Sequence, residues 1–348
     1  MKIIAKFKLN LYKITSYTTF LKGLILKKII IILFVVVLTI FGYVAFISAD
    51  SKSILTKKIN CALNNEESCY NLGVYFLEEE NYDLNSSIKF FDKACKLSNA
   101  LACNHLGYIY QIGATNEPDI EKAKKYYQKG CDAGLVLACN NNGFIYESVD
   151  KNLKKALEYY EKSCEQNNTF ACNRSGIIHQ GEGGDLVKSI NAFIRSCNNG
   201  DPTGCNNLAV FYQNGVVVEK NLNLAAELYA NSCEAKNYTA CNNLAIFYQN
   251  GIGVEQNPAT AIKLYDLACA NNEGYACSNL GYLVQNGIGI EQNIELALNL
   301  YQKSCQLGNE TGCNMLNSLA QAIEEFKKQN RSQTNPETKK ESSPAIVR

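Results

Sequence analysis

Residues 240–277 read ACNNLAIFYQNGIGVEQNPATAIKLYDLACANNEGYAC, a stretch that begins and ends with the same Ala-Cys step. Each of these two cysteines has another cysteine eight positions before it, and this C-x7-C spacing recurs along the chain. The pairs are Cys61/Cys69, Cys95/Cys103, Cys131/Cys139, Cys164/Cys172, Cys197/Cys205, Cys233/Cys241, Cys269/Cys277 and Cys305/Cys313. Successive pairs begin 33 to 36 residues apart, and a regular period in this range predicts a solenoid of helical hairpins.

Each period carries the patterns of two helices. Counted from the second cysteine of a pair, small or apolar residues stand at positions +3, +4 and +7, as Leu244, Ala245 and Tyr248 do after Cys241. A second apolar run precedes the next pair and contains Ala261, Leu264, Tyr265 and Ala268. Both runs have the spacing of an amphipathic helix, and an Asn-Gly step between them suits a helix end. Several units carry Gly at +4, which predicts close helix packing: Gly73, Gly107, Gly143, Gly176 and Gly281.

The net charge of +1 hides an uneven distribution. Residues 1–49 contain seven Lys and no acidic residue, so the remaining chain has 34 − 7 = 27 basic against 33 acidic residues, a balance of −6. Phosphate binding needs clustered Lys and Arg on one face, and nucleic acid is therefore not expected as a partner.

An uncharged apolar segment covers residues 29–49 and follows a basic leader, residues 1–28. The segment is long enough to cross a bilayer, and the charge before it predicts that the leader is cytoplasmic. The alternative is a signal peptide cleaved after Ala49. Either way the body is expected to be exported across a bacterial inner membrane, as a membrane-anchored periplasmic protein or, after cleavage, as a secreted one.

The units resemble the Sel-1-like repeat, a relative of the tetratricopeptide repeat. The pattern is clearest in CNNLAVFYQNGVVVEKNLNLAAELY, CNNLAIFYQNGIGVEQNPATAIKLY and CSNLGYLVQNGIGIEQNIELALNLY, which start at Cys205, Cys241 and Cys277. The C-x7-C in every unit is similar to that of the Helicobacter cysteine-rich protein family. The resemblance implies an all-α, right-handed solenoid of αα-hairpins over residues 55–323. It also implies penicillin binding and β-lactamase activity, which have been attributed to that family.

The cysteine spacing favours disulfides within each C-x7-C pair. The last turn of one helix and the first turn of the next lie side by side across a short connection, close enough for a disulfide. This pairing uses all sixteen cysteines. Two alternatives remain open: bridges within each hairpin, such as Cys69–Cys95, which would leave Cys61 and Cys313 unpaired, and zinc binding, although the spacing and an oxidising location favour disulfides.

Catalytic residues are hard to find. The two histidines, His105 and His179, lie in different units, and His179 takes a core position held elsewhere by Tyr. Ser86-x-x-Lys89 fits a β-lactamase motif but falls at the start of an ordinary second helix, and Tyr229-Ala230-Asn231 contains the core Tyr of its repeat. The Lys-Thr-Gly element of those enzymes is missing from the sequence, so no catalytic residue can be assigned. No cofactor and no metal site are expected.

The remaining candidate is a binding surface. Positions +2 and +9 turn away from the packing stripe and carry Asn207, Asn214, Asn243, Asn250, Asn279 and Asn286, with Arg174 at +2 of an earlier unit. In tetratricopeptide-like solenoids the first helices line the concave side, where Asn can hold an extended peptide. The alternative is that the +9 residues only close their helices. The sequence therefore predicts a monomeric scaffold that binds proteins, peptides or cell-wall fragments, with β-lactam hydrolysis as the alternative function.

Two further expectations concern exposed parts of the chain. Replacing Asn207, Asn243 and Asn279 together by Ala is expected to leave the fold intact, since they are predicted to face solvent. Residues 324–348 are polar and without periodicity, which predicts a disordered tail.

Overall fold

A computed structural model describes residues 53–181 and 183–334, and within these ranges no helix is both long and apolar enough to span a bilayer. The basic leader 1–28 and the apolar segment 29–49 lie outside the described residues, as does the tail from residue 335. The regular secondary structure of the described chain is helical, and the described chain divides into two compact units at the boundary between residues 138 and 139.

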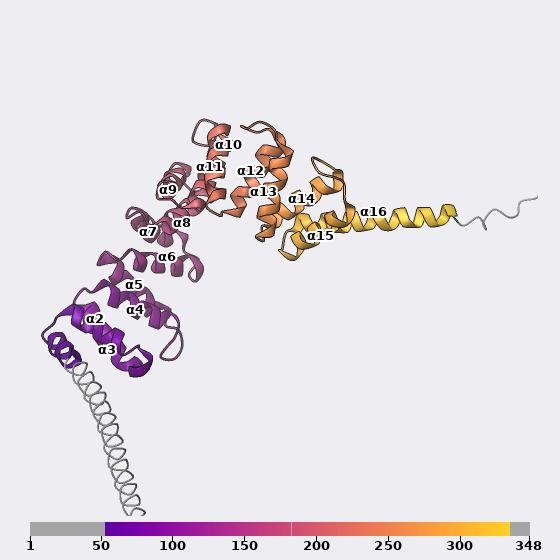
Figure 1. The fold of residues 1–348 in the computed structure, drawn as a ribbon. Coiled ribbons are helices and arrows are strands. Elements are labelled where there is room, and N and C mark those ends of the chain that lie inside the picture. Colours follow the sequence, from indigo (N-terminus) through magenta and orange to yellow (C-terminus); the bar gives the residue numbers. More distant parts are fainter. Residues whose placement is uncertain (1–52, 182, 335–348) are drawn as a thin grey trace, which may run out of the picture. The chain divides into compact units, whose positions relative to one another are not determined.

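The helices follow one another as antiparallel pairs (Figure 1). In the first unit a helix over residues 53–62 is followed by α2 (Glu66–Tyr75), the short η1 (Glu79–Asn81), α3 (Leu84–Lys96), α4 (Ala100–Gln111) and α5 (Ile120–Asp132). The helix α6 (Val136–Ser148) begins just before the boundary between the units. The second unit continues with α7 (Leu153–Cys164), α8 (Thr169–Gln180), α9 (Leu186–Asn198), α10 (Pro202–Asn214), α11 (Leu222–Glu234), α12 (Tyr238–Asn250), α13 (Pro258–Ala270), α14 (Gly274–Asn286), α15 (Ile294–Gln306) and α16 (Glu310–Thr334).

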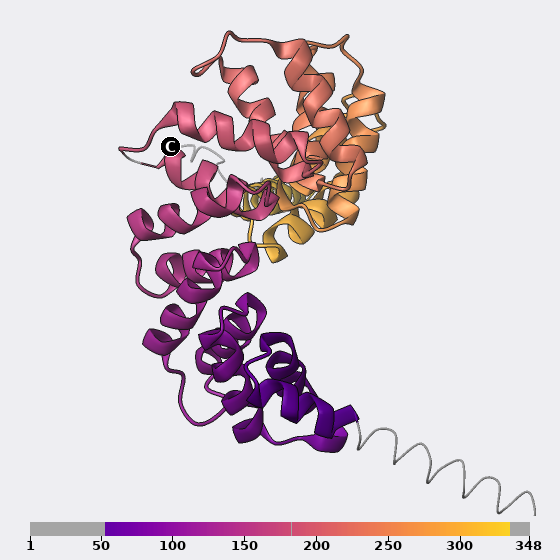
Figure 2. The ribbon, with the colours of Figure 1, turned by 90° about the vertical axis from the view of Figure 1, so that its left-hand side faces the viewer.

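In the second unit each hairpin packs against the next, as Figure 2 shows from a second side. The second helix of a hairpin contacts the first helix of the following one, as in α9 with α10 and α11 with α12. First helices of neighbouring repeats also touch, α8 with α10 and α12 with α14. The predicted solenoid of αα-hairpins is confirmed.

Capping residues explain where the helices begin and end. Before α12, the side chain of Asn237 accepts a hydrogen bond from the backbone N–H of Ala240, and Asn or Asp does the same at most other helix starts. The helices α10, α12 and α14 end at glycines in the left-handed conformation, Gly215, Gly251 and Gly287. The predicted Asn-Gly helix ends therefore lie where the sequence places them.

The core of each hairpin is one aromatic ring packed on a small residue. Tyr301 of α15 is fully buried, and a Cβ added at Gly281 of α14 would come within 2.7 Å of its ring. The same glycine-on-ring contact occurs in four other hairpins, at Gly73, Gly107, Gly143 and Gly176. The Tyr301 hydroxyl donates to Gln285 Oε1 at 2.7 Å, so the buried polar atom is satisfied. Glycine at +4 is thus a packing residue, as predicted.

The cysteines join each second helix to the first helix of the next hairpin. Seven C-x7-C pairs have Cα–Cα distances between 4.5 and 4.8 Å, within the range a disulfide requires. Cys131 and Cys139 are disulfide-bonded as well, and no free cysteine is found in the described part of the chain. The seven bridges are Cys61–Cys69, Cys95–Cys103, Cys164–Cys172, Cys197–Cys205, Cys233–Cys241, Cys269–Cys277 and Cys305–Cys313.

The surroundings of Cys103 show that this cysteine is a core residue. Cys103 lies in the first turn of α4, is 1% exposed and is bonded to Cys95 at the end of α3, with a Cα–Cα distance of 4.8 Å. Its Sγ is 3.6 Å from the Cys95 carbonyl. A bridge within the hairpin would join Cys103 to Cys131 instead, and zinc would need it as a free thiolate, so its bond to Cys95 excludes both alternatives for this residue. The predicted Cys95–Cys103 disulfide is confirmed, and Cys103 is part of the buried packing.

The C-terminal helix differs from the expected tail. α16 continues to Thr334, so residues 324–334 are helical where the sequence predicts disorder. Its first turns pack on the core, with Leu319 buried and Ile323 half-buried against the same cluster. A helix already anchored by packing adds further residues at little cost, because nucleation is the expensive step.

The positive φ of the loop residue Val217 indicates a substitution that should stabilise the fold. Val217 has a φ of 68°, while the residues at the same position of the next two repeats, Gly253 and Gly289, have φ values of 63° and 71°. A β-branched side chain is strained in this left-handed region. We expect Val217→Gly to raise the free energy of unfolding by about 0.5–1 kcal/mol, since the relief of strain exceeds the entropy cost of glycine.

Urea unfolding followed by circular dichroism measures this change. The control is Val216→Gly at the neighbouring residue, which has no positive φ and should gain nothing. Equal effects of the two substitutions would show that Val217 is not strained.

Candidate functional site

The exposed side of the first helices is the candidate site. In the second unit, positions −2, +2, +5 and +9 from the second cysteine of each pair lie on one side of the helix, since they are spaced by four, three and four residues. We call this surface of α8, α10, α12 and α14 the first-helix face. It consists of Phe170, Arg174, Ile177 and Gly181; Thr203, Asn207, Val210 and Asn214; Thr239, Asn243, Ile246 and Asn250; and Tyr275, Asn279, Tyr282 and Asn286, all at least partly exposed.

In α8 and α14, large apolar or aromatic side chains are exposed at positions −2 and +5 of this face. Phe170 and Ile177 of α8 are 48% and 40% exposed, and Tyr275 and Tyr282 of α14 are 61% and 43% exposed. These positions were missed by the sequence reasoning, which considered only +2 and +9. Aligning the units on their second cysteine gives the signal, because both positions lie outside the +3, +4 and +7 packing stripe.

Three consecutive helices of the face carry no charged side chain. The sequences of α10, α12 and α14 contain no Lys, Arg, Asp or Glu. Their partner helices α11, α13 and α15 do carry charges. Depletion of charge together with exposed tyrosine is the composition of an interface core rather than of ordinary solvated surface.

The asparagines at +2 are tied to one another across repeats. Asn279 Nδ2 donates to Asn242 Oδ1 at 2.9 Å, and Asn243 Nδ2 donates to Asn206 Oδ1 at 3.0 Å. Within the repeats, Asn242 Nδ2 and Asn206 Nδ2 donate to the Oδ1 atoms of Asn243 and Asn207 at 3.5 and 3.3 Å. The five residues form a continuous chain of amide hydrogen bonds along α10, α12 and α14.

This amide chain changes the expectation for Asn207, Asn243 and Asn279. They are half-buried, and their partners Asn206 and Asn242 are only 8% and 6% exposed. Replacing all three by Ala would leave buried amide groups without partners, which costs free energy. The triple substitution is therefore expected to destabilise the fold, contrary to the sequence-based expectation.

The asparagines at +9 serve their own helices. Asn250 Nδ2 donates to the Ile246 carbonyl at 2.9 Å and Asn286 Nδ2 to the Tyr282 carbonyl at 2.8 Å. Both residues therefore satisfy carbonyls of the last turn, which is the helix-closing alternative left open by the sequence. Asn214 is exposed at the corresponding end of α10.

Arg174 is not a free donor for a ligand. Its guanidinium forms a two-point ion pair with Glu147 of α6, with Nε at 3.2 Å from Oε2 and Nη2 bound to Oε1. The Tyr160 hydroxyl donates to the same carboxylate at 2.8 Å. Glu147 occupies position +8 of its repeat. In several other repeats this position is a glutamine, such as Gln285, that accepts a hydrogen bond from the hydroxyl of the core tyrosine. The predicted charge-assisted site at Arg174 is thus an internal pair.

An open cleft lies at the C-terminal end of the face, between α14 and α16. It has a volume of about 450 Å³ and is lined by Tyr282, Gln285, Asn286, Tyr301, Thr311, Asn314, Met315, Ser318, Leu319 and Ala322. None of these ten residues is charged. The volume falls in the range of ligand sites, and amide, hydroxyl and thioether groups mixed with apolar surface suit a neutral ligand. We refer to it as the α14/α16 cleft.

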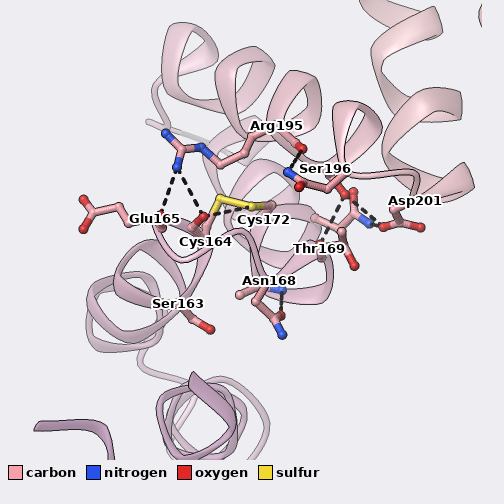
Figure 3. The surroundings of a disulfide bond; sticks show 12 residues. Ser163, Cys164, Glu165, Asn168, Thr169, Cys172, Arg195, Ser196 and Asp201 are labelled. Carbon is pink, nitrogen blue, oxygen red and sulfur yellow. Dashed lines mark hydrogen bonds between the residues drawn. A yellow bond between two sulfur atoms is a disulfide. The ribbon is translucent and has the colours of Figure 1, made fainter. Parts of the chain in front are cut away.

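A second hollow, of about 270 Å³, lies between the second helices α7 and α9. Figure 3 shows Arg195 beside the Cys164–Cys172 disulfide, where its Nη1 contacts the carbonyls of Cys164 and Glu165 at 3.5 and 3.2 Å. Lys303 donates to the Cys269 carbonyl in the same way at 2.7 Å. These cations satisfy the end of the preceding helix, so this hollow is part of the repeat architecture.

The two motifs that resemble β-lactamase elements, at Ser86 and Tyr229, make structural contacts. Ser86 lies in the first turn of α3, and its backbone N–H donates to Asp83 Oδ1 at 3.1 Å. No hydrogen bond joins Ser86 to Lys89 in the described chain, and Lys89 is exposed. The Tyr229 hydroxyl, buried in the core, donates to Gln213 Oε1 at 2.7 Å. Helix capping and core packing account for both motifs.

The two histidines are also structural. His105 stacks on Phe91 with ring centroids 5.0 Å apart, and burial lowers its pKa. His179 is buried, and its Nε2 lies 2.9 Å from Glu161 Oε1. Burial alone would raise the pKa of Glu161, but hydrogen bonds from His179 and Lys188 outweigh burial and hold the pKa below its usual value. In the described residues, no cluster of His, Cys, Asp and Glu could hold a metal ion.

Comparison with known families identifies the repeat. The profile of the Sel1 repeat matches residues 66–99, 100–135, 138–168, 202–237, 239–273 and 274–309, well over half of the chain. The chain belongs to the Sel1 repeat family. The structure adds a further hairpin, α8 with α9, in the unmatched interval, where Arg174, Ser175 and His179 depart from the repeat pattern. A search of curated proteins gives no match.

Solved structures include other Sel1 repeat proteins. The protective antigen c5321 of uropathogenic Escherichia coli, described as having an SLR fold, is 25% identical with a TM-score of 0.65, covering 76% of this chain and 59% of that chain. This Sel1 repeat chain therefore spans 59% of the length of c5321. A Sel1 repeat protein from Oxalobacter formigenes is 20% identical with a TM-score of 0.66, and the match covers 75% of this chain and 78% of that chain. Helicobacter pylori cysteine rich protein B is 32% identical over 39% of this chain and 99% of that chain, with a TM-score of 0.32.

Proposed function

We propose that this Sel1 repeat protein is an exported, membrane-anchored scaffold that binds an extended, uncharged segment of a partner protein along the first-helix face. The observation that carries the proposal is that α10, α12 and α14 contain no Lys, Arg, His, Asp or Glu, combined with exposed Tyr275 and Tyr282. Solenoids of this kind present extended surfaces on which other proteins bind.

Export is supported by the cysteines and by the N-terminal sequence. Disulfides form and persist in oxidising compartments outside the cytoplasm, and every C-x7-C cysteine is bonded. The apolar segment 29–49, preceded by a basic leader, has the length of a membrane anchor.

The chemistry of the face favours a neutral polypeptide over charged cell-wall fragments or β-lactams. A carboxylate ligand needs a cation to replace its hydration, and the one Arg of the face, Arg174, already pairs with Glu147. The rings of Tyr275 and Tyr282 supply apolar contact area at low entropy cost, and tyrosine hydroxyls can donate to and accept from a peptide backbone.

The test is selection of linear peptides on the full-length protein held in lipid nanodiscs, followed by calorimetry of the enriched peptides. We expect enrichment of apolar and uncharged sequences. Since the one charged residue of the face, Arg174, is already paired with Glu147, the dissociation constant should be nearly the same at low and high salt. Enrichment of acidic or basic peptides with strongly salt-dependent affinity would refute the proposal.

Substitutions on α14, at one end of the face, locate the binding surface. Tyr275→Ser and Tyr282→Ser are each expected to weaken binding by about tenfold, because a buried aromatic side chain contributes roughly 1–3 kcal/mol of apolar contact. The matched control is Leu296→Ser on α15 of the same hairpin, a residue that is 40% exposed but belongs to a second helix. An equal loss with the control would place the binding surface elsewhere.

A further inference from the structure

The helix over residues 53–62 has an apolar outer side that other second helices lack. Leu55, Ile59 and Leu63 are 58%, 52% and 76% exposed, and their spacing puts them along one side of the helix and its last turn. We call these three residues the end stripe. Ile54, one position earlier than Leu55, packs into the core of the first unit, so the stripe is separate from the core-facing side.

Comparison among the repeats shows how unusual this side is. Leu55 lies six residues before the first cysteine of its pair, a position that is exposed in every other repeat and always polar or charged. The equivalents of Leu55 are Lys89, Lys125, Glu158, Asn191, Glu227, Lys263 and Asn299. The equivalents of Ile59, two residues before the first cysteine, are Lys93, Lys129, Lys162, Arg195, Asn231, Leu267 and Lys303. Among the repeats, only the helix 53–62 has apolar residues at both positions.

The contacts of the equivalent residues show which way the stripe faces. Lys93 Nζ lies 3.4 Å from the Ala62 carbonyl, and Arg195 and Lys303 likewise reach carbonyls of the second helix before them. Ile59 therefore points to the side on which a preceding repeat would stand. In the described part of the chain, no helix precedes 53–62. An end repeat normally needs a polar outer side to stay soluble, so an apolar one requires a cover.

The short stretch of chain between the apolar segment and the helix indicates which surface contacts the end stripe. Only residues 50–52 separate Ala49, the end of the apolar segment, from Ser53. An extended chain gains at most 3.6 Å per residue, so Ser53 lies within about 14 Å of the point where the segment ends. If residues 29–49 cross the bilayer, the helix is held at the membrane surface.

We propose that the end stripe docks on the outer surface of the bilayer that holds the anchor, with Leu55, Ile59 and Leu63 inserted among the lipid acyl chains at the interface. This inference rests on the membrane anchoring in the proposed function and does not depend on peptide binding. It assigns the first helix of the exported body a second membrane contact, which holds the first unit against the lipid surface.

Tryptophan fluorescence tests the contact directly, because the chain contains no Trp. The full-length chain with Ile59→Trp is reconstituted in vesicles of phosphatidylethanolamine and phosphatidylglycerol, with or without lipids brominated on the acyl chains. We expect a blue-shifted emission that brominated lipids reduce by about twofold or more, as for a side chain buried in the interface. Leu55→Trp is the second reporter, on the same stripe.

The matched control is Leu267→Trp, at the same repeat position as Ile59 and 44% exposed. Its emission should stay red-shifted and unquenched. A blue-shifted but unquenched emission from Ile59→Trp would mean that protein, either the chain's own N-terminal residues or a second copy, covers the stripe, and would overturn the proposal. So would emission identical to that of the control.

Alkaline carbonate extraction of the same vesicles separates this failure from failure of the anchor. Retention of the chain with an unquenched reporter overturns only the docking of the stripe. Release of the chain overturns the anchoring on which the inference rests. Peptide binding, measured on the same sample, reports independently on the first-helix face.

Discussion

Reduction of the disulfides is expected to lower the stability of this Sel1 repeat protein more than any single substitution. Each bridge closes a loop with a sequence separation of eight residues, which corresponds to about 2–3 kcal/mol per bridge in the chain-entropy relation. In a repeat array these contributions accumulate along the chain, since stability is a sum of local terms. Urea unfolding with and without dithiothreitol should therefore show a large shift of the midpoint, with reduced protein unfolding at low urea.

A single bridge gives the quantitative check. The pair of substitutions Cys233→Ser and Cys241→Ser should lower the free energy of unfolding by about 2–3 kcal/mol in oxidised protein and by little in reduced protein. Mass spectrometry after thiol blocking without reductant should find every bridge within its own C-x7-C, with Cys103 linked to Cys95. A Cys69–Cys95 linkage, or free thiols in native protein, would contradict both the pairing and the expected energy.

Arg174→Ala is expected to destabilise the second unit by about 2–3 kcal/mol, because it leaves the Glu147 carboxylate without its cation. The Glu147 side chain is only 15% exposed, whereas that of Arg174 is 33% exposed, so the estimate lies at the low end for a broken buried pair. Thermal and urea unfolding measure the loss. The Tyr160 hydroxyl remains as one donor to the carboxylate, which limits the effect.

Rescue by a second substitution distinguishes the ion pair from simple loss of packing. Glu147→Gln introduces the residue type that accepts a hydrogen bond from the core tyrosine in other repeats, as Gln285 does from the Tyr301 hydroxyl. The double variant Glu147→Gln with Arg174→Asn has the residue types of the C-terminal repeats and should recover most of the stability. If the double variant is as unstable as Arg174→Ala, the carboxylate is not the cause.

The hairpin architecture was predictable because its determinants are local and repeated. Gly281 and Tyr301 are twenty residues apart in one hairpin, and the two cysteines of each pair are eight apart, so a single period contains both partners of these contacts. The unmatched hairpin α8–α9 could still be placed from Cys172 and Cys197, although its other residues depart from the repeat pattern.

The candidate site was predictable only in part. The first helices, predicted as the binding surface, do expose Phe170 and Tyr282, and several of the residues predicted on them also make internal contacts. Asn250 and Asn286 cap their helices, and Arg174 is paired with Glu147. Apolar positions −2 and +5 were overlooked because an apolar residue in a helical pattern is usually assigned to the core.

The sequence by itself determined the period, the helices and their caps, the glycine-on-ring packing and the cysteine pairs, since each depends on residues within one repeat. Only the tertiary structure decided how repeats share polar groups. Asn279 reaches Asn242, 37 positions away, and Arg174 reaches Glu147, 27 positions away. Such contacts depend on the offset between stacked hairpins, which a repeating pattern does not specify. The same offset determines which side chains stay exposed, and so it decides where a partner can bind.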